Sequence, residues 1–409
     1  MHGAIRSPTT IDARRPTAFC VYTARALRDF GDGFTAVLLP VYLTARGLGA
    51  FEVGVVATLA LLGSALTTLA VGLLGAHADQ RRLLVAGSAL MVLTGLAFAA
   101  SSTYAVVLLV AFVGTINPSG GSVSIFVPLE HAVLSHSVAD AERTKMFACY
   151  GLVGAVAAAL GALASASPDV LIRLGTSQLT ALSAMFLLYA CLGMAGAVLY
   201  AQIPGEMAQT AERPVSALGP SRGIVYRMAA LFSIDSFAGG LAVQSLLALW
   251  LFNKFELSLS AAGLFFFWSG VLSAFSFPVA AWLSKRIGLV NTMVFTHMPS
   301  SVCLILAAIA PSLEIALALL LAKAALSQMD VPTRSSYVMA VVTPLERPAA
   351  ASFTSVPRSL AAASSPALAG ALFAAGFEAW PLVICGVLKI AYDVLLLRQF
   401  RHLKPPEER

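Results

Sequence analysis

Ionisable side chains lie inside long apolar stretches of this sequence, where they can hold a charge or carry a proton. The stretch at 17–45 contains Arg25, Arg28, Asp29 and Asp32 among apolar residues. A charge at the centre of a bilayer is costly unless it is paired or hydrated, so such residues mark functional sites by default. Acids of this kind can transfer protons, and arginines can bind anions.

The composition is that of an integral membrane protein. The chain has 409 residues, of which 58% are hydrophobic and 11% charged, with a mean hydropathy of +0.85, whereas soluble domains carry about 25% charged residues. Apolar runs of about 20 residues recur, the length that crosses the hydrocarbon core as a helix. We predict an all-α membrane protein with twelve transmembrane helices at 17–45, 52–75, 83–101, 104–134, 145–166, 178–202, 224–250, 260–283, 289–310, 314–342, 349–374 and 380–400.

The net charge of +6 indicates membrane orientation rather than nucleic-acid binding. With the amino terminus inside, most basic residues outside the predicted spans lie on the inner side, and only Arg46, Arg173 and Lys254 lie outside. The apolar run after the polar first sixteen residues is too long and too charged for a cleaved signal peptide. We therefore predict a multi-pass protein of the inner membrane with both termini in the cytoplasm and no nucleic-acid partner.

No pattern in the sequence indicates a cofactor or an enzyme. The five cysteines fall in or beside apolar runs without the paired spacing of a metal site or disulfide framework. A phosphate-binding Gly-x-x-x-x-Gly-Lys-Ser/Thr loop does not occur. The predicted spans contain no paired histidine ligands. We expect no cofactor, no bound metal and no enzymatic activity.

The chain divides into two halves of six predicted spans. Residues 203–223 form the one polar stretch with Pro and Gly that is long enough to be a linker. This predicts an N-terminal bundle at 1–202, a cytoplasmic linker at 203–223 and a C-terminal bundle at 224–409.

The two halves also resemble each other. Val127-Pro128 recurs 204 residues later as Val331-Pro332, and Asp29 recurs 206 residues later as Asp235. A nearly constant offset over several matches favours an internal repeat, and parallel six-helix repeats are typical of one large class of transporters.

The loop between the second and third predicted spans reads Gly75-Ala76-His77-Ala78-Asp79-Gln80-Arg81-Arg82. It resembles the signature loop of the major facilitator superfamily, Gly-x-Leu-Ala-Asp-Arg-x-Gly-Arg-Arg, although it lacks the second glycine and has His77 in place of leucine. The resemblance covers essentially the whole chain.

That resemblance implies two six-helix bundles around a central cavity that opens alternately to either side, with spans one, four, seven and ten lining it. It also makes Gly75, Asp79, Arg81 and Arg82 candidate gating residues. The alternative is that Arg81 and Arg82 only enforce the topology.

Several charges inside the spans have a partner one helical turn away. Such neighbours can neutralise each other without any functional role. The pairs spaced four residues apart are Arg25 with Asp29, Arg28 with Asp32, Asp330 with Arg334, and Lys389 with Asp393. For the last two residues, near the end of span twelve, we expect a structural role, either as a pair or by snorkelling to the interface.

The other charges need partners on other helices or a wet cavity. They are Glu130 with His131, Asp235, Lys323 and Arg358. With depth and cavity-lining spans considered, the candidate proton-coupling residues are Glu130, Asp235 and Asp32, and the candidate substrate-binding residues are Arg28, His131, Arg334, Arg358 and Asn117.

Some of these candidates have alternatives. Glu130 aligns with Arg334 in the repeat, so the two could pair across the halves and close a cytoplasmic gate. His131 either titrates or packs. Arg358 either binds a carboxylate or oxyanion of the substrate or forms a salt bridge to Asp235 or Asp330. Asn117 opens a polar, glycine-rich segment, which predicts a kink that exposes backbone groups to the cavity.

Together these features predict a secondary active transporter with a small-molecule substrate, protons and the bilayer as partners, acting as a monomer. Our first prediction is proton-coupled export of a small organic or anionic solute. The second is proton-coupled import of an anionic nutrient through Arg28, Arg334 and Arg358. A membrane sensor that no longer transports, built on the same fold, is the alternative from another class.

Overall fold

The computed structural model describes residues 14–74, 79–100, 103–120, 124–137, 143–204 and 218–403. Helices account for the regular structure of this part of the chain, and no strand occurs in it. The predicted all-α fold is confirmed. Most of the predicted linker lies outside the described residues, so the division at 203–223 stays a prediction.

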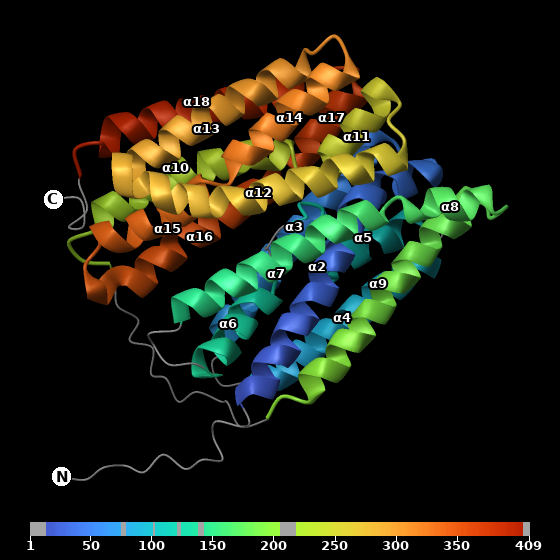
Figure 1. Ribbon diagram of the computed structural model, residues 1–409, viewed down its shortest axis with the longest axis horizontal. Coiled ribbons are helices and arrows are strands. Elements are labelled where there is room, and N and C mark those ends of the chain that lie inside the picture. Colours follow the sequence, from blue (N-terminus) through green and yellow to red (C-terminus); the bar gives the residue numbers. More distant parts are fainter. Residues whose placement is uncertain are drawn as a thin grey trace.

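The N-terminal group of helices contains one clear interruption. The predicted span at 104–134 is not one helix: it ends at Val113 and resumes at Phe126, with the predicted polar segment between. The helices of this group are α2 (Arg14–Ala45), α3 (Ala50–Leu74), α4 (Gln80–Ala100), α5 (Tyr104–Val113), α6 (Phe126–Ser137), α7 (Arg143–Ala164), α8 (Ser167–Arg173) and α9 (Gln178–Ala201) (Figure 1).

The C-terminal group is interrupted in three of its predicted spans. Spans seven, ten and eleven each consist of two helices in succession. The elements are α10 (Arg222–Leu241), α11 (Gln244–Phe255), α12 (Leu259–Ile287), α13 (Leu289–Ala308), α14 (Leu313–Ser327), α15 (Asp330–Val341), the short turn η3 (Pro344–Glu346), α16 (Arg347–Ser364), α17 (Pro366–Ala374) and α18 (Trp380–Phe400).

Corresponding breaks support the internal repeat. Helix α6 begins at Phe126 and α15 at Asp330, and they end at Ser137 and Val341, so both ends differ by the offset of 204 seen in the sequence. The helix that follows the break therefore occupies the same place in both halves, whereas the helix before the break ends at Val113 in one half and at Ser327 in the other.

Nine helical stretches within the described ranges are long and apolar enough to cross a membrane. The first predicted span carries four charges, the fourth is interrupted, and the eleventh is rich in polar residues, which explains why they are not among the nine. The count of twelve stays a prediction.

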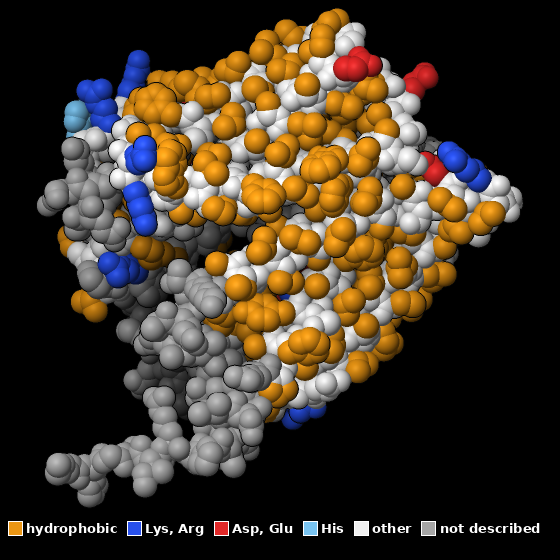
Figure 2. Space-filling model, in the orientation of Figure 1, with side chains coloured by type: hydrophobic (Ala, Val, Ile, Leu, Met, Phe, Trp, Pro, Cys, Tyr) orange, Lys and Arg blue, Asp and Glu red, His pale blue; other side chains and the backbone are white. Residues whose placement is uncertain are grey.

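The surface is that of a membrane protein. Figure 2 shows hydrophobic side chains over both groups of helices, with charged side chains mostly toward the two ends of the view. Phe275 is 70% exposed and Leu109 62% exposed. Apolar exposure on this scale is expected where lipid rather than water surrounds the protein.

The two groups meet closely at one end only. We call the end where α2 begins and α18 ends the terminal side, and the other end the opposite side. On the opposite side α3 packs on α17, and α7 on α12, whereas the groups separate toward the terminal side (Figure 1). The amide of Ala367 donates to Thr58 Oγ1 at 2.9 Å, and Gly54 lies directly against Gly370. The opposite side is therefore sealed by backbones in close approach.

Glu346 ties the end of the predicted linker to the turn before α16. Its carboxylate accepts hydrogen bonds from the amide of Gly219 at 2.6 Å, from the Ser221 hydroxyl at 2.7 Å and from the Thr343 hydroxyl at 2.6 Å. These donors, led by the Thr343 and Ser221 hydroxyls, lower the pKa of Glu346 to about 2.

We expect Gly54→Val to open the seal. A β-carbon at Gly54 would lie 2.6 Å from the Pro366 carbonyl oxygen and 2.9 Å from the Gly370 Cα, so α3 and α17 must move apart. A cysteine at Thr58, in a background without native cysteines, should then react faster with an impermeant maleimide added on the opposite side. Gly223→Val, where an added β-carbon meets nothing within 4 Å, serves as the control. Unchanged labelling in the Gly54 variant would show that this contact is not the seal.

The lowered pKa of Glu346 predicts a pH-dependent contribution to stability. The unfolded carboxyl titrates near 4.3, so the contribution is fully present above about pH 4.5 and is lost as the pH falls toward about 2. Thermal unfolding in detergent across this range should show a decrease that is smaller in Glu346→Gln. Parallel decreases in both proteins would contradict this assignment.

Candidate functional site

A cavity of about 450 Å³ lies between the two groups of helices. Its N-terminal wall includes Arg25, Asp29, Ser119, Gly120 and small residues of α7, and its C-terminal wall is formed mainly by α10, α11, α12 and α14. Glycine, alanine and serine dominate both walls. The small side chains leave the space open and let the backbones approach the cavity.

A smaller chamber of about 180 Å³ extends from this cavity into the C-terminal group. The two spaces share several lining residues, namely Gly239, Ala242, Lys323, Ser327 and Gln328. The chamber is lined further by Asp235, His297, Asp330, Arg334 and Lys389. Three of its side chains are bases and two are acids, with His297 in addition.

The interrupted helices shape the place where the halves meet. Asn117 is buried, and its side-chain oxygen accepts hydrogen bonds from the Ser119 amide and hydroxyl. The carbonyl of Pro118 accepts from the amide of Ser245 at 3.0 Å, across the two groups. Gly120 has a φ of +60°, and a β-carbon there would collide with the Gln244 side chain. Asn117 therefore shapes the turn, while Ser119 and Gly120 reach the cavity.

A buried ion pair joins α2 and α6 in the N-terminal group. The Arg28 guanidinium donates to both oxygens of Glu130 at 2.9 Å, and the Tyr150 and Tyr200 hydroxyls also donate to this carboxylate. Arg28 also lies 4.6 Å from the centre of the Phe126 ring.

This geometry corrects two predictions. Arg28 pairs with Glu130 and, at 3.4 Å, with Asp29, not with Asp32. Glu130 does not pair with Arg334 across the halves, because each is already bound within its own group. The predicted pair of Arg25 with Asp29 is confirmed at 2.9 Å.

Asp32 is the buried acid that Arg28 leaves without a base. Within the described part of the chain its carboxylate accepts only the Tyr189 hydroxyl, at 3.3 Å, and it is 4% exposed. The Tyr189 hydroxyl lies 3.1 Å from the Thr115 hydroxyl as well. A carboxylate in such a place is costly when ionised.

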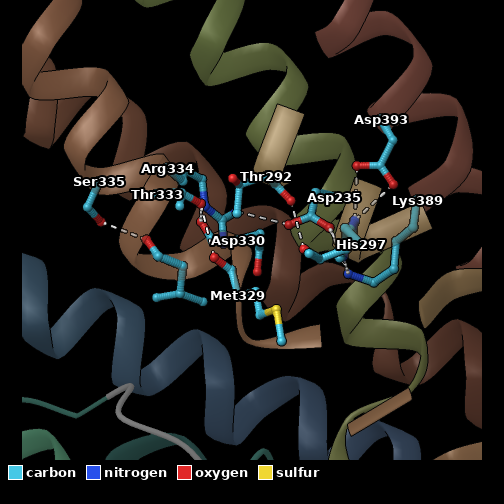
Figure 3. A network of polar contacts seen from close by, with 12 residues as sticks. Asp235, Thr292, His297, Met329, Asp330, Thr333, Arg334, Ser335, Lys389 and Asp393 are labelled. Carbon is cyan, nitrogen blue, oxygen red and sulfur yellow. Dashed lines mark hydrogen bonds and ion pairs between the residues drawn. The ribbon is translucent and has the colours of Figure 1, made fainter. Parts of the chain in front are cut away.

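Asp235 is the centre of a second network, in the C-terminal group (Figure 3). Its Oδ2 accepts from Arg334 at 3.0 Å, and its Oδ1 accepts from the Lys389 ammonium at 2.7 Å. Arg334 also pairs with Asp330 at 2.8 Å, as predicted. His297 Nδ1 lies 3.1 Å from both oxygens of Asp393.

The interpretation of Lys389 and Asp393 as a structural pair was wrong. Each side chain turns to another helix: Lys389 to Asp235 and Asp393 to His297. A spacing of one helical turn allows two charges to pair, but it does not show whether a closer partner lies on a neighbouring helix. His297 was not among the predicted site residues, although a lone histidine within a predicted span is a signal for such a site.

Two bases in the C-terminal group have no counter-ion. Among the residues that the structure describes, neither Lys323 nor Arg358 has an ion pair or a side-chain hydrogen bond. The predicted pairing of Arg358 with Asp235 or Asp330 is therefore not present. Lys323 lines both the central cavity and the chamber, so its ammonium is open to an incoming ligand.

The two groups carry opposite imbalances of charge. Apart from charges in the first or last four residues of a predicted span, the described N-terminal group has three acids and two bases: Asp29, Asp32 and Glu130 with Arg25 and Arg28. On the same count the C-terminal group has three acids and four bases: Asp235, Asp330 and Asp393 with Lys323, Arg334, Arg358 and Lys389. The surplus acid is Asp32, and a surplus base is Lys323.

The remaining candidates lie away from the cavity. His131 is half-buried, with its ring 4.6 Å from Phe147 and 4.7 Å from Tyr150. Asp79 accepts the amide of Arg81 at the start of α4 and lies 3.6 Å from Arg82.

Gly75 lies outside the described residues, and the gating roles stay predictions. The described residues contain no group of three or more His, Cys, Asp or Glu placed to hold a metal ion.

We expect Glu130→Gln to destabilise the protein without removing the pH dependence of transport. Removing one partner of a buried pair leaves the other uncompensated, at a cost of about 3–5 kcal/mol. Combining it with Arg28→Gln should cost less than the sum of the single changes. Thermal unfolding measures the first effect, and transport against pH the second, with exposed Glu314→Gln as the control. Loss of pH dependence in a folded Glu130→Gln protein would restore Glu130 as the coupling acid.

Comparison with known proteins agrees with this architecture. The family model of the Major Facilitator Superfamily matches residues 19–243. The chain is 23% identical to the "Uncharacterized membrane protein YJR124C" of Saccharomyces cerevisiae, over 91% of this chain and 92% of that protein.

Two solved transporters have a similar fold. A bacterial homolog of the human lysosomal transporter Spinster, in an inward-facing and unoccupied conformation, superposes with a TM-score of 0.72 at 14% identity, over 97% of this chain and 99% of that one. The nucleoside transporter NupG gives 0.72 at 13% identity, over 94% and 99%. The chain therefore belongs to the major facilitator superfamily and is a multi-pass membrane transporter rather than an enzyme.

Proposed function

We propose that this protein is a proton-coupled transporter of a small organic anion. The observation that carries the proposal is Lys323, an ammonium without a counter-ion at the junction of the central cavity and the chamber. An unpaired charge inside a membrane protein is expected to face a water-filled path or a ligand. An anionic substrate would supply the missing counter-charge.

The size and charge of the chamber support this substrate class. Its lining residues carry three cations and two acids, and its volume of about 180 Å³ suits a carboxylate or a similar small oxyanion. The central cavity of about 450 Å³ would take the rest of the molecule. Its walls of serine, glycine and alanine restrict the shape and polarity of that part of the substrate only weakly.

Proton coupling requires an acid or base whose charge can change during the cycle. Glu130 is held by Arg28 and two tyrosines, so we assign it a structural role in this state. Asp32 has one hydroxyl donor and no base in the described structure, which makes it the best proton site of the N-terminal group. Asp235 remains a candidate in the C-terminal group.

Sidedness follows from the basic residues. We propose that the terminal side faces the cytoplasm of an inner membrane, because most basic residues of the loops belong to that side in the predicted topology. The protein would act as a monomer, since the cavity and the chamber lie within one chain. The seal on the opposite side would then represent a state open to the cytoplasm.

The direction depends on how proton and anion binding are coupled. If they compete, an inward proton gradient drives export, which is our first prediction from the sequence. If they favour each other, the same gradient drives import of an anionic nutrient. A sensor on this fold would bind the anion without any flux. Flux in proteoliposomes with an imposed pH gradient of either sign separates the three.

We expect Lys323→Gln to lose anion transport selectively. An interaction with a charged group contributes about 1.5–3 kcal/mol, so the apparent affinity for a transported carboxylate should fall about tenfold or more. Lys323→Arg, which keeps the positive charge, should retain part of the affinity for the carboxylate. Counterflow in proteoliposomes with carboxylates, phosphate esters, neutral solutes and cationic dyes measures both.

The control for this prediction is Lys254→Gln. Lys254 lies near the end of α11, where its ammonium donates to the carbonyl of Ala308, the last residue of α13. Transport of cationic dyes but not of anions, unaffected by Lys323→Gln, would reject the proposal.

A further inference from the structure

The contacts of His297 fix which of its nitrogens carries the proton. Its Nε2 lies 3.3 Å from the Lys389 ammonium, which can only donate. Nε2 must therefore accept, and the hydrogen lies on Nδ1, which donates to Asp393 at 3.1 Å. In this state His297 is a neutral imidazole held between an acid and a base.

A proton on Nε2 would compete with Lys389 for the same acid. Nε2 lies 3.6 Å from Asp235 Oδ1, the atom that accepts from Lys389 at 2.7 Å. Two cations cannot remain 3.3 Å apart in a buried site without a large electrostatic cost. The protonated imidazole would donate to Oδ1 instead, and Lys389 would lose its place there.

We propose that protonation of His297 releases Lys389 from Asp235 and so creates a second anion-binding ammonium in the chamber. The ligand would be the carboxylate or other small oxyanion of the substrate, bound between Lys323 and Lys389. This inference rests on the proposed function and names its coupling residue. His297 acts through Lys389 and does not need to contact the substrate.

The surroundings of His297 restrict the exchange to this one contact. Arg334 holds the other oxygen of Asp235 and also Asp330, so neither acid is left without a base when Lys389 departs. The Tyr392 ring lies 6.0 Å from the imidazole. The ionisable groups around it are Asp235 of α10, Lys323 of α14, Asp330 and Arg334 of α15, and Cys385, Lys389, Tyr392 and Asp393 of α18.

The exchange makes proton binding and anion binding cooperative. The added proton raises the surplus positive charge of the chamber by one, and an anion between the two ammonium groups offsets it. By linkage, the proton must raise anion affinity by the same factor as the anion raises proton affinity. Ligands that bind together are carried together, so an inward proton gradient would drive uptake of the anion.

The first test measures anion affinity and proton uptake in the purified protein. As the pH is lowered from about 8 to 5, affinity for a transported carboxylate should rise up to tenfold per pH unit, with up to one proton taken up per anion. In His297→Gln the affinity should stay at the high-pH value of the wild type, without proton uptake. Exposed His402→Gln should match the wild type.

Two further variants keep the inference testable if His297→Gln fails to fold. Lys389→Gln should hold the low affinity at every pH. Asp393→Asn should keep the pH dependence but shift its midpoint to lower pH, because it removes the negative charge that stabilises the imidazolium.

Wild-type affinity that does not change with pH, or unchanged pH dependence in folded His297→Gln, would overturn the role of His297 while leaving the anion transporter intact. No anion binding by the wild type at any pH would instead overturn the proposed function itself.

Discussion

The cost of burying charge is the constraint on which this structure depends. Each half joins the helix that begins it to its interrupted fourth span through a buried ion pair, Arg28 with Glu130 in one and Asp235 with Arg334 in the other. The base lies on the first helix in the N-terminal half and on the later helix in the C-terminal half. Glu130 and Arg334 occupy matching positions in the repeat, whereas Arg28 lies one residue before Asp29, the match of Asp235, and the polarity of the pair is reversed. Each pair fixes the first helix of its half against the interrupted span.

Two charges that remain outside these ion pairs determine the proposed function. The N-terminal half retains a surplus acid, Asp32, and the C-terminal half a surplus base, Lys323. Neither charge is satisfied by the described protein, and both lie in a protein with an internal cavity. A proton can neutralise the first and an anion the second. The exchange at Asp235 connects the two kinds of ligand, because Lys389 and a protonated His297 require the same oxygen.

The interrupted helices make this chemistry accessible. Lipid cannot satisfy an unpaired backbone group, so a break in a spanning helix must lie inside the protein or along a cavity. At the break between α5 and α6, the Pro118 carbonyl bonds to the amide of Ser245 at the start of α11. Ser119 and Gly120 then form part of the cavity wall. Close approach of small residues, such as Gly54 to Gly370 on the opposite side, lets the halves seal at one end while a cavity remains between them.

The sequence by itself determined the membrane class, the family and the repeat, because apolar length and local spacing are properties of the chain in order. It did not show that spans seven, ten and eleven each consist of two helices. It also located the charged residues and the polar segment from Asn117 that lies within the break between α5 and α6. Only the tertiary structure decided which charges meet. The spacing of Lys389 and Asp393 suggested one pair, whereas Asp235 and His297 on other helices provide closer partners. In a low dielectric the energy of an ion pair depends strongly on the distance between the charges. Helix packing sets that distance, and the order of residues does not show it.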